Sequence, residues 1–451
     1  MKQKFSTERG QALIVLALAA IGIFGIVGLA IDGSAKFSDR RHAQNAADTA
    51  AMAGALELAR GDTANWTNTA KNVADENGYD GNLVSNQVWV YYCDAIPLSS
   101  PVDCGPYNNY HSYIQVVITS RVNTSFAKVV GIQQTQNIVQ AVAYTDEGGP
   151  LYKGDAIIQL NPTGSGCPGE FILGGSGTVT IDGGGLFVNS NNTGNNNCAA
   201  FTQDGCQTTL TVINGGGITA VGQIFTDPCN GNDMINATET EGAEPYPFPP
   251  PPEEVPPAPP ECAAGTYGYV QNNFPTNGTS TIWPGKYDTL PPAQATEKII
   301  VMKPGNYCIF EAVQVTGSQT KIYASDIFIY IRYNSQKVNP LSLQGGTVDI
   351  DAPDTGDYKG YLIYVDPGPV VNDMYTGSPK KCNINGQSDD AFTGTIYAPY
   401  CEMTINGGGN PDGFHAQLIA YEVKLSGNND LSFIYDESDT ADLKSRLGLM
   451  R

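Results

Sequence analysis

Residues 175–182 read GSGTVTID and show the pattern that decides the fold of most of the chain: a Gly-containing turn, then residues that alternate apolar and polar. The pattern returns irregularly at residues 215–225, 345–351, 403–407 and 423–427. Short strands between Gly or Asn corners are typical of a β-solenoid, because each coil turns tightly and keeps apolar or small residues inside. No fixed period is visible. The predicted fold is a right-handed parallel β-helix with irregular coils, and a β-sandwich is the alternative.

The composition agrees with a mainly β protein. The chain has 451 residues, of which 51 are Gly and only 15% are charged, and its length allows two or three domains. Its formal net charge is −21. A strongly acidic exterior repels phosphate backbones, so we expect no nucleic-acid binding.

The ten Cys residues all follow the first ninety residues, and none forms a CxxC pair. This spacing disfavours zinc sites and favours disulfides in an oxidising compartment. Cys93–Cys104 and Cys382–Cys401 are the expected pairs, because each would close a short loop between strand-like segments. The further candidates are Cys198, Cys206, Cys229 and Cys262.

A Pro-rich segment, EPYPFPPPPEEVPPAPPE at residues 244–261, interrupts the β region. Its prolines impose an extended polyproline conformation and cannot continue a central strand. The segment would be either a docking motif for a Pro-recognising partner or a stiff excursion laid along the solenoid. We favour the excursion, closed by Cys229 and Cys262.

The run ALIVLALAAIGIFGIVGLAI at residues 12–31 has no charge, and at about 1.5 Å per residue it spans about 30 Å, the thickness of a hydrocarbon core. Lys2, Lys4 and Arg9 precede it, so the positive-inside rule places residues 1–10 in the cytoplasm and the rest of the chain outside. We therefore expect a transmembrane helix at residues 11–31. A cleaved signal peptide is the alternative.

An Ala-rich stretch continues this helix to about residue 61. Small residues recur along it at spacings of three and four, which places them on one helix face: Ala43, Ala46, Ala47, Ala50, Ala51 and Gly54. Small side chains let backbones approach closely, so this stripe would pack against another copy, a related subunit, or its own domain. If the stripe meets another copy or a related subunit, Ala47→Leu or Ala51→Leu would weaken the association of the two chains and leave folding intact.

The N-terminal segment also carries a resemblance. Gly10 stands just before the apolar run, Gly28–Asp32 ends it, and residues 44–48 read QNAAD before the Ala-rich helix. Together these features resemble the N-terminal signature of TadE/TadG-like pilus-assembly proteins of the Tad (tight adherence) system. The resemblance implies a minor pilin-like or scaffold component with pilus-assembly or envelope proteins as partners. In pilin-type leaders a peptidase cuts after a Gly, here Gly10. A Glu usually follows five residues on, where this chain has Val15, so a retained anchor stays an alternative.

Beyond the anchor, the sequence predicts a small α+β module at residues 62–148, which resembles the first extracellular module of TadG-like proteins. The β-helix is expected at residues 149–437, followed by a C-terminal tail at 438–451. The segments at residues 392–436 and 303–310 resemble coils of Gly-rich β-helical modules found behind TadG-like N-termini.

An enzyme is not expected, although parallel β-helices also host polysaccharide-active enzymes. Glycoside hydrolysis needs two carboxylates about 5–9.5 Å apart, and the candidates are Asp349 with Asp351 or Asp389 with Asp390. The other motifs of polygalacturonases are absent from the sequence. Neither a cofactor nor a metal site is expected. The predicted function is a membrane-anchored, extracytoplasmic structural protein for surface adhesion. An anchored polysaccharide-active enzyme and a surface-layer or matrix protein are the alternatives, and a homo-oligomer is a further expectation.

Overall fold

The computed structural model of the protein describes the following residues: 9–109, 111–146, 148–162, 171–194, 198–204, 206–226, 235–251, 255–262, 278–291, 299–316, 319–371, 374–375, 377–386, 390–407, 414–427, 430–443 and 446–450. The chain forms two compact units. Unit 1 consists of Met1–Gly149 and Lys444–Arg451, and unit 2 is Pro150–Leu443.

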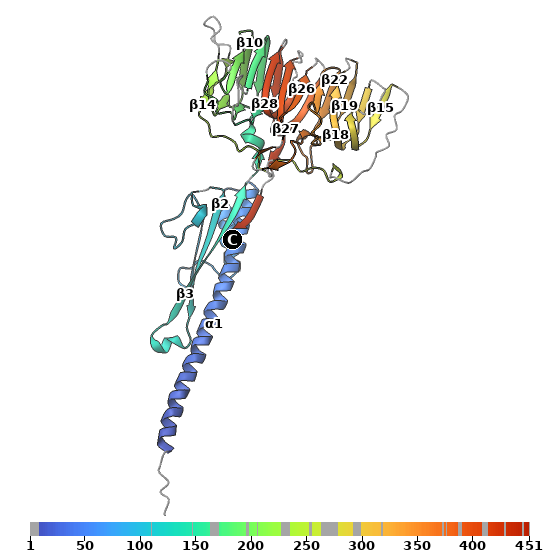
Figure 1. Ribbon diagram of the computed structural model, residues 1–451. Coiled ribbons are helices and arrows are strands. Elements are labelled where there is room, and N and C mark those ends of the chain that lie inside the picture. Colours follow the sequence, from blue (N-terminus) through green and yellow to red (C-terminus); the bar gives the residue numbers. More distant parts are fainter. Residues whose placement is uncertain are drawn as a thin grey trace, which may run out of the picture. The chain divides into compact units, whose positions relative to one another are not determined.

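Unit 1 is organised around one long helix, α1 (Arg9–Ala59). Its first part is apolar all round, and the large apolar side chains from Leu13 to Ile31 are exposed, with Leu16 72% and Leu29 75% exposed. A helix of this length and composition can cross a membrane. The expected transmembrane helix and the expected Ala-rich helix are therefore one unbroken element (Figure 1).

The second part of α1 packs against an antiparallel sheet with the strand order β1-β2-β3-β31. The elements of this sheet and its helices are α2 (Trp66–Glu76), β1 (Asn86–Tyr92), η1 (Gly105–Tyr107), β2 (Tyr113–Asn123), η2 (Ala127–Val130), β3 (Gln134–Asp146) and β31 (Arg446–Met450). The sequence analysis placed a small α+β module at residues 62–148, a range that contains α2 and the first three strands. It assigned residues 438–451 to a tail, which is wrong for β31, because the apolar Leu447 and Leu449 complete the edge of the sheet beside β3.

Unit 2 is a parallel β-helix, as the sequence predicted. Its described strands fall into three parallel stacks, and four strands, β16, β18, β27 and β28, pass from one stack into the next. In spatial order, the first stack is β14 (Glu239–Glu241), β11 (Ile218–Ala220), β8 (Leu186–Val188), β5 (Ile157–Gln159), β28 (Phe414–Gly427), β27 (Ala391–Gly407), β23 (Tyr361–Val365), β20 (Ile327–Ile331), β18 (Gly305–Val315) and β16 (Gly285–Leu290).

The other two stacks follow the same spatial order. The second is β12 (Ile224–Phe225), β9 (Phe201–Asp204), β6 (Phe171–Gly175), β28, β27, β26 (Lys380–Asn385), β21 (Leu341–Leu343), β18 and β16. The third is β13 (Ile235–Asn236), β10 (Thr208–Ile213), β7 (Gly177–Asp182), β29 (Leu431–Ile434), β28, β27, β22 (Thr347–Asp351), β19 (Lys321–Ala324), β17 (Ile299–Met302) and β15 (Thr279–Ile282). Outside the stacks lie η3 (Leu151–Gly154), η5 (Pro260–Cys262) and the short strands β4 (Gly149–Pro150), β24 (Val370–Val371), β25 (Met374–Tyr375) and β30 (Asp442–Leu443).

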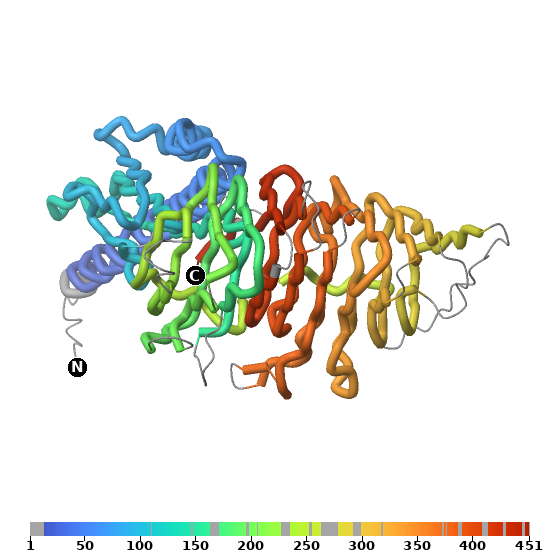
Figure 2. The backbone as a smooth tube through the Cα atoms, turned by 90° about the horizontal axis from the view of Figure 1, so that it is seen from above, coloured from blue at the N-terminus to red at the C-terminus, as the bar shows by residue number. Residues whose placement is uncertain are grey.

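The coils of unit 2 are stacked in an order that differs from the chain order. The C-terminal strands β28 and β29 pair with β5, β6 and β7, which belong to the first coil in the sequence. Figure 2 shows the result along the stack: green coils, then red, then orange and yellow. The rows of inward-facing side chains continue where β28 and β29 meet β5, β6 and β7. The rings of Phe392, Phe414 and Phe433 stack 5.0 and 5.1 Å apart, and Phe433 then pairs with Ile181. Spatially, residues 279–434 therefore precede residues 157–241.

The Pro-rich segment makes this order feasible. We call residues 244–262 the strap. Its contacts move along the stack: Tyr246 exchanges hydrogen bonds with Asn189, whose coil contains β8, and Glu261 accepts one from Asn306 in β18. From β14 to β18 the first stack takes eight steps of about 4.8 Å, or about 38 Å. A flexible chain of 19 residues, the length of the strap, averages only about 24 Å end to end, whereas a polyproline helix of 19 residues reaches about 59 Å.

The strap covers a second apolar layer on the outside of the first stack. There the strands are buried on both faces, as in IFIYI of β20 and YLIYV of β23. The outward residues form one cluster with partly buried strap residues Tyr246, Phe248 and Val255. The ring of Phe248 lies near three further rings, those of Tyr375, Tyr400 and Tyr421. The strap is thus a stiff excursion laid along the solenoid.

The disulfides agree with the sequence analysis except at the strap. The structure joins Cys93 to Cys104 and Cys382 to Cys401, the two expected pairs. Cys198 and Cys206 are disulfide-bonded as well. The expected closure of the Pro-rich segment by Cys229 and Cys262 is wrong, because Cys262 is bonded to Cys308. This bond fixes the end of the strap on β18, and Cys229 lies outside the described residues.

Candidate functional site

The residues of the N-terminal signature meet the sheet of unit 1 in two places. The first is where the loop between β2 and β3 touches α1, and we call that loop, residues 124–133, the hairpin tip. The backbone N–H groups of Ser125 and Ala127 each donate to the carboxylate of Asp32 at 2.7 Å, and that of Phe126 donates at 3.0 Å. Asp32 therefore binds the start of η2 with charge-assisted hydrogen bonds, which are stronger than neutral ones.

Gly28 is needed for the same contact. A Cβ atom at this position would lie 2.7 Å from both Cβ and Cγ of Phe126, which is closer than non-bonded carbon atoms approach one another. Among the described residues, and leaving aside the backbone of the helix itself, no atom lies within 4 Å of the corresponding point at Gly25 or Gly33. Gly28 and Asp32, one helical turn apart, thus form a joint between α1 and the hairpin tip.

Asp39 makes the next polar contact along the helix. Its carboxylate accepts hydrogen bonds from Asn137 Nδ2 at 2.7 Å and from the Ser120 hydroxyl, both buried at the helix–sheet boundary. Burial, followed by the charge of Asp39, raises the pKa of the neighbouring Tyr79 above its usual range. Tyr79 therefore remains a neutral donor toward Asp39.

The second meeting place is the stripe of small residues. Ala43, Ala46, Ala47, Ala50 and Ala51 are all 0% exposed and belong to one core cluster with α2 and the sheet. Gly54 lies there too, facing Ala70 and Ile114. The stripe thus packs on its own domain, and the expectation that it meets another subunit is wrong. The small side chains let the helix approach its own sheet, so Ala47→Leu and Ala51→Leu are now expected to disturb the packing of unit 1.

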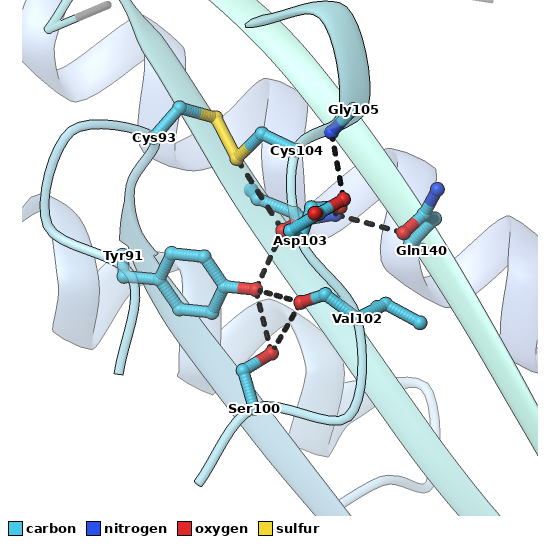
Figure 3. Close-up of a disulfide and its surroundings, with 9 residues drawn as sticks. Tyr91, Cys93, Ser100, Val102, Asp103, Cys104, Gly105 and Gln140 are labelled. Carbon is cyan, nitrogen blue, oxygen red and sulfur yellow. Dashed lines mark hydrogen bonds between the residues drawn. A yellow bond between two sulfur atoms is a disulfide. The ribbon is translucent and has the colours of Figure 1, made fainter. Parts of the chain in front are cut away.

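A groove lies beside the stripe on unit 1, with a volume of about 370 Å³. Gln44 and Asp48 of the QNAAD motif line it, and the Gln44 amide donates to Asp48 Oδ1 at 2.8 Å and to the Gln140 carbonyl at 2.9 Å. The groove also touches the Cys93–Cys104 disulfide, which closes the loop after β1 (Figure 3). The motif therefore connects α1 to β3 as well as lining this surface.

The disulfide loop is held by a buried hydrogen-bond network (Figure 3). The Tyr91 hydroxyl contacts Gln115 Oε1 at 2.5 Å and the Val102 carbonyl at 3.0 Å. Gln115 Nε2 donates to the Asp103 carbonyl and to Gln140 Oε1, both at 2.9 Å. Because these polar groups satisfy one another inside the unit, the network fixes the loop and is a structural feature.

The candidate catalytic carboxylates lie in unit 2. Asp349 and Asp351 are both half-buried and outward-facing on β22, and burial, followed by the charge of Asp351, raises the pKa of Asp349. Asp390 is buried and accepts the backbone N–H of Val348 at 2.8 Å. Asp389 lies outside the described residues. Within the part of the chain that the structure describes, no group of three His, Cys, Asp or Glu side chains is placed to hold a metal ion.

Sequence reasoning missed the hairpin tip. It singled out Gly28–Asp32 as part of a motif but assigned no contact to either residue. A signal was present: the segment FAKVVGI at residues 126–132 places several large apolar residues in a turn between two strands. Turns are usually polar, so such a turn indicates a buried or membrane-facing contact.

These features define a class of protein: a membrane-anchored chain whose N-terminal apolar helix continues into the core of its first folded unit. Residues 10–57 match the family model described as putative Flp pilus-assembly TadE/G-like. The chain therefore carries the Tad signature that its N-terminal sequence resembled, and it is related to pilus-assembly proteins through this segment. Neither a curated protein nor a solved structure matched the chain.

Proposed function

We propose that the protein is an extracytoplasmic structural component of a Tad-type pilus-assembly system, a minor pilin-like subunit that serves surface adhesion. The observation that carries the proposal is the coincidence of the family match with the architecture of unit 1. The matched residues 10–57 contain the apolar helix, the joint at Gly28 and Asp32, and the buried stripe. The signature therefore encodes an anchor together with its attachment to a folded unit.

The proposed orientation has the N-terminus in the cytoplasm and both units outside. Three basic residues, Lys2, Lys4 and Arg9, precede the apolar run, which supports a cytoplasmic N-terminus. The disulfides in both units support an oxidising compartment for the rest of the chain. Protease added to intact spheroplasts is expected to degrade units 1 and 2 and to spare a short N-terminal fragment. Full protection of both units would refute the orientation.

We propose that the protein acts by assembly and display and has no catalytic activity. Asp390 supports this, because its carboxylate already accepts a backbone hydrogen bond at the start of β22. The double substitution Asp349→Asn, Asp351→Asn is expected to leave pilus-dependent adhesion unchanged. Turnover of a glycan by the purified protein, abolished by these two changes, would instead support the polysaccharide-active alternative.

The pilus role can be tested by complementation. Deletion of the gene is expected to reduce both the fraction of piliated cells and adhesion to a surface. The unsubstituted chain and the Gly33→Ala variant should restore both, since a Cβ at Gly33 would meet no described residue beyond its own helix. Gly54→Leu should restore them less fully, because the new side chain enters the packed boundary between α1 and its sheet and lowers the stability of unit 1. Normal piliation and adhesion in the deletion strain would refute the pilus role.

A further inference from the structure

The hairpin tip carries a group of exposed apolar side chains on the folded region of unit 1. Val129 is 88% and Val130 77% exposed, and Phe126 and Ile132 are exposed as well. Large apolar side chains that gather on a protruding turn usually mark a contact with a partner or a membrane.

The position of the hairpin tip along α1 distinguishes a contact with a partner from a contact with the membrane. Asn137 donates to the carbonyl of Lys36, and Thr145 donates to that of Ala55. From residue 137 to residue 145 the strand advances by eight steps, about 26 Å, and from residue 36 to residue 55 the helix advances by 19 steps, about 28 Å. β3 therefore runs alongside α1, and the hairpin tip that precedes it lies at the membrane end of the sheet.

The depth of the hairpin tip follows from its contact with Gly28. Phe126 packs on Gly28, which comes three residues before Ile31, the end of the uncharged run. At about 1.5 Å per residue, Phe126 lies about 4.5 Å on the membrane side of that end. The exposed residues beside it are thus continuous with the exposed apolar surface of the helix.

The backbone of the hairpin tip suits a position inside a lipid leaflet, where unpaired polar groups cost free energy. Its first N–H groups are bound by Asp32, while those of Val129, Gly131 and Ile132 donate to carbonyls within the turn at 3.0 Å. Lys128 is exposed on the same turn and would reach the phosphate level of the lipids, as lysines near membrane surfaces do.

We propose that the hairpin tip inserts into the lipid leaflet on the side of unit 1 and forms a second membrane contact beside α1. The inference rests on α1 crossing a membrane, as proposed above. Two attachment points prevent unit 1 from rotating about the helix axis, so its sheet and its groove face a fixed direction relative to the bilayer.

Fluorescence quenching by brominated lipids tests the proposal on the full chain. The protein is reconstituted into vesicles of phosphatidylethanolamine and phosphatidylglycerol with or without dibrominated acyl chains, with one Trp added per variant. The variants are Val129→Trp in the hairpin tip, Leu16→Trp in the apolar helix as the positive control, and the fully exposed Leu98→Trp at the opposite end of the sheet as the negative control. The unsubstituted protein gives the background of its three native Trp residues, and formation of the Cys93–Cys104 disulfide checks folding.

Brominated lipid is expected to remove most of the added emission at positions 129 and 16 and to leave that at position 98 unchanged. Quenching at position 16 without quenching at positions 129 and 130, the latter tested with Val130→Trp, would overturn the inference and leave the anchor intact. A protein partner covering the hairpin tip would give this result. An absence of quenching at position 16 would overturn the anchor, and the inference with it.

Discussion

Gly54 offers a direct test of how unit 1 is packed. A Cβ atom at this position would lie 3.2 Å from the Ala70 Cβ and 3.2 Å from the Ile114 Cδ1, both fully buried. Gly54→Ala gains about 1 kcal/mol in helix propensity and loses part of it to these tight contacts, so its net effect should be close to zero. Gly54→Leu adds three more carbon atoms to filled space.

Overpacking of a core costs about 1–3 kcal/mol, and the helix gain offsets part of that cost. The expected net loss for Gly54→Leu is therefore about 1–2 kcal/mol, or about 2–8 °C in the melting temperature of unit 1. Gly33→Leu is the matched control on the same helix, because nothing lies within 4 Å of its Cβ position. It should leave the stability unchanged or raise it slightly.

The measurement is hydrogen–deuterium exchange with peptide resolution, followed across β2 at increasing urea concentration. This readout reports on unit 1 alone, so the unfolding of unit 2 does not enter the result. Equal exchange in Gly54→Leu and the unsubstituted protein would refute the argument that small residues are needed to bring the helix onto its sheet. Loss of association between copies without any change in exchange would restore the partner interpretation of the stripe.

Three further predictions concern the joint, the strap and a half-buried acid. Asp32→Ala should increase amide hydrogen exchange at residues 125–127, because it removes the acceptor of their N–H groups, and Asp32→Asn should increase it less. Equal protection of these amides in the unsubstituted protein and in both variants would contradict the joint. Replacing Cys262 and Cys308 by Ser together should destabilise unit 2 by up to about 4 kcal/mol and expose the strap to protease first, as limited proteolysis would show; an unchanged cleavage pattern would argue against the strap's role. Burial raises the pKa of Asp155 to about 6, and the charge of Lys153 opposes this shift only partly. The protonated carboxyl therefore contributes fully to the stability of the folded state below about pH 4, and this contribution is lost as the pH rises through 6. Asp155→Asn should therefore remove roughly 1–2 kcal/mol of pH dependence between pH 4 and 7 in urea titrations, a figure reduced for partial exposure; an equally steep pH dependence in the variant would exclude Asp155 as its source.

The β-helix could be predicted because its signal is local. A segment such as residues 175–182 alternates inward apolar and outward polar residues, and Val179 and Ile181 are fully buried as that alternation requires. The outer layer under the strap could not be read in the same way. The strands IFIYI and YLIYV are apolar on both faces, and a continuous apolar run does not reveal what covers its second face.

The order of the coils could not be predicted, because every coil presents the same kind of inward ladder to its neighbours. Nothing in Phe433 indicates that its partner is Ile181, far back in the chain, as well as the adjacent Phe414. The error at Cys262 has the same origin. Its partner depends on where the strap ends on the stack, and that position follows from the order of the coils.

The stripe from Ala43 to Gly54 was ambiguous for another reason. A row of small residues encodes a close approach of two backbones and contains no information about which backbone approaches. The polar residues beside the row carried that information. Asp39, Gln44 and Asp32 each bind a backbone or side-chain group of the module's own strands or of the hairpin tip.

The participation of β31 in the sheet of unit 1 has a consequence for biosynthesis. Unit 2 is encoded between β3 and β31, which are antiparallel neighbours with Asp146 opposite Arg446. Because β31 follows unit 2 along the chain, the sheet of unit 1 acquires this strand only after the whole solenoid has been synthesised. A chain that stalls or is cut before residue 446 therefore leaves β3 as an open edge, which is prone to pair with other chains. Completion of this edge therefore marks a chain that has been synthesised through unit 2, and a protease that senses unpaired strands would distinguish it from a truncated chain.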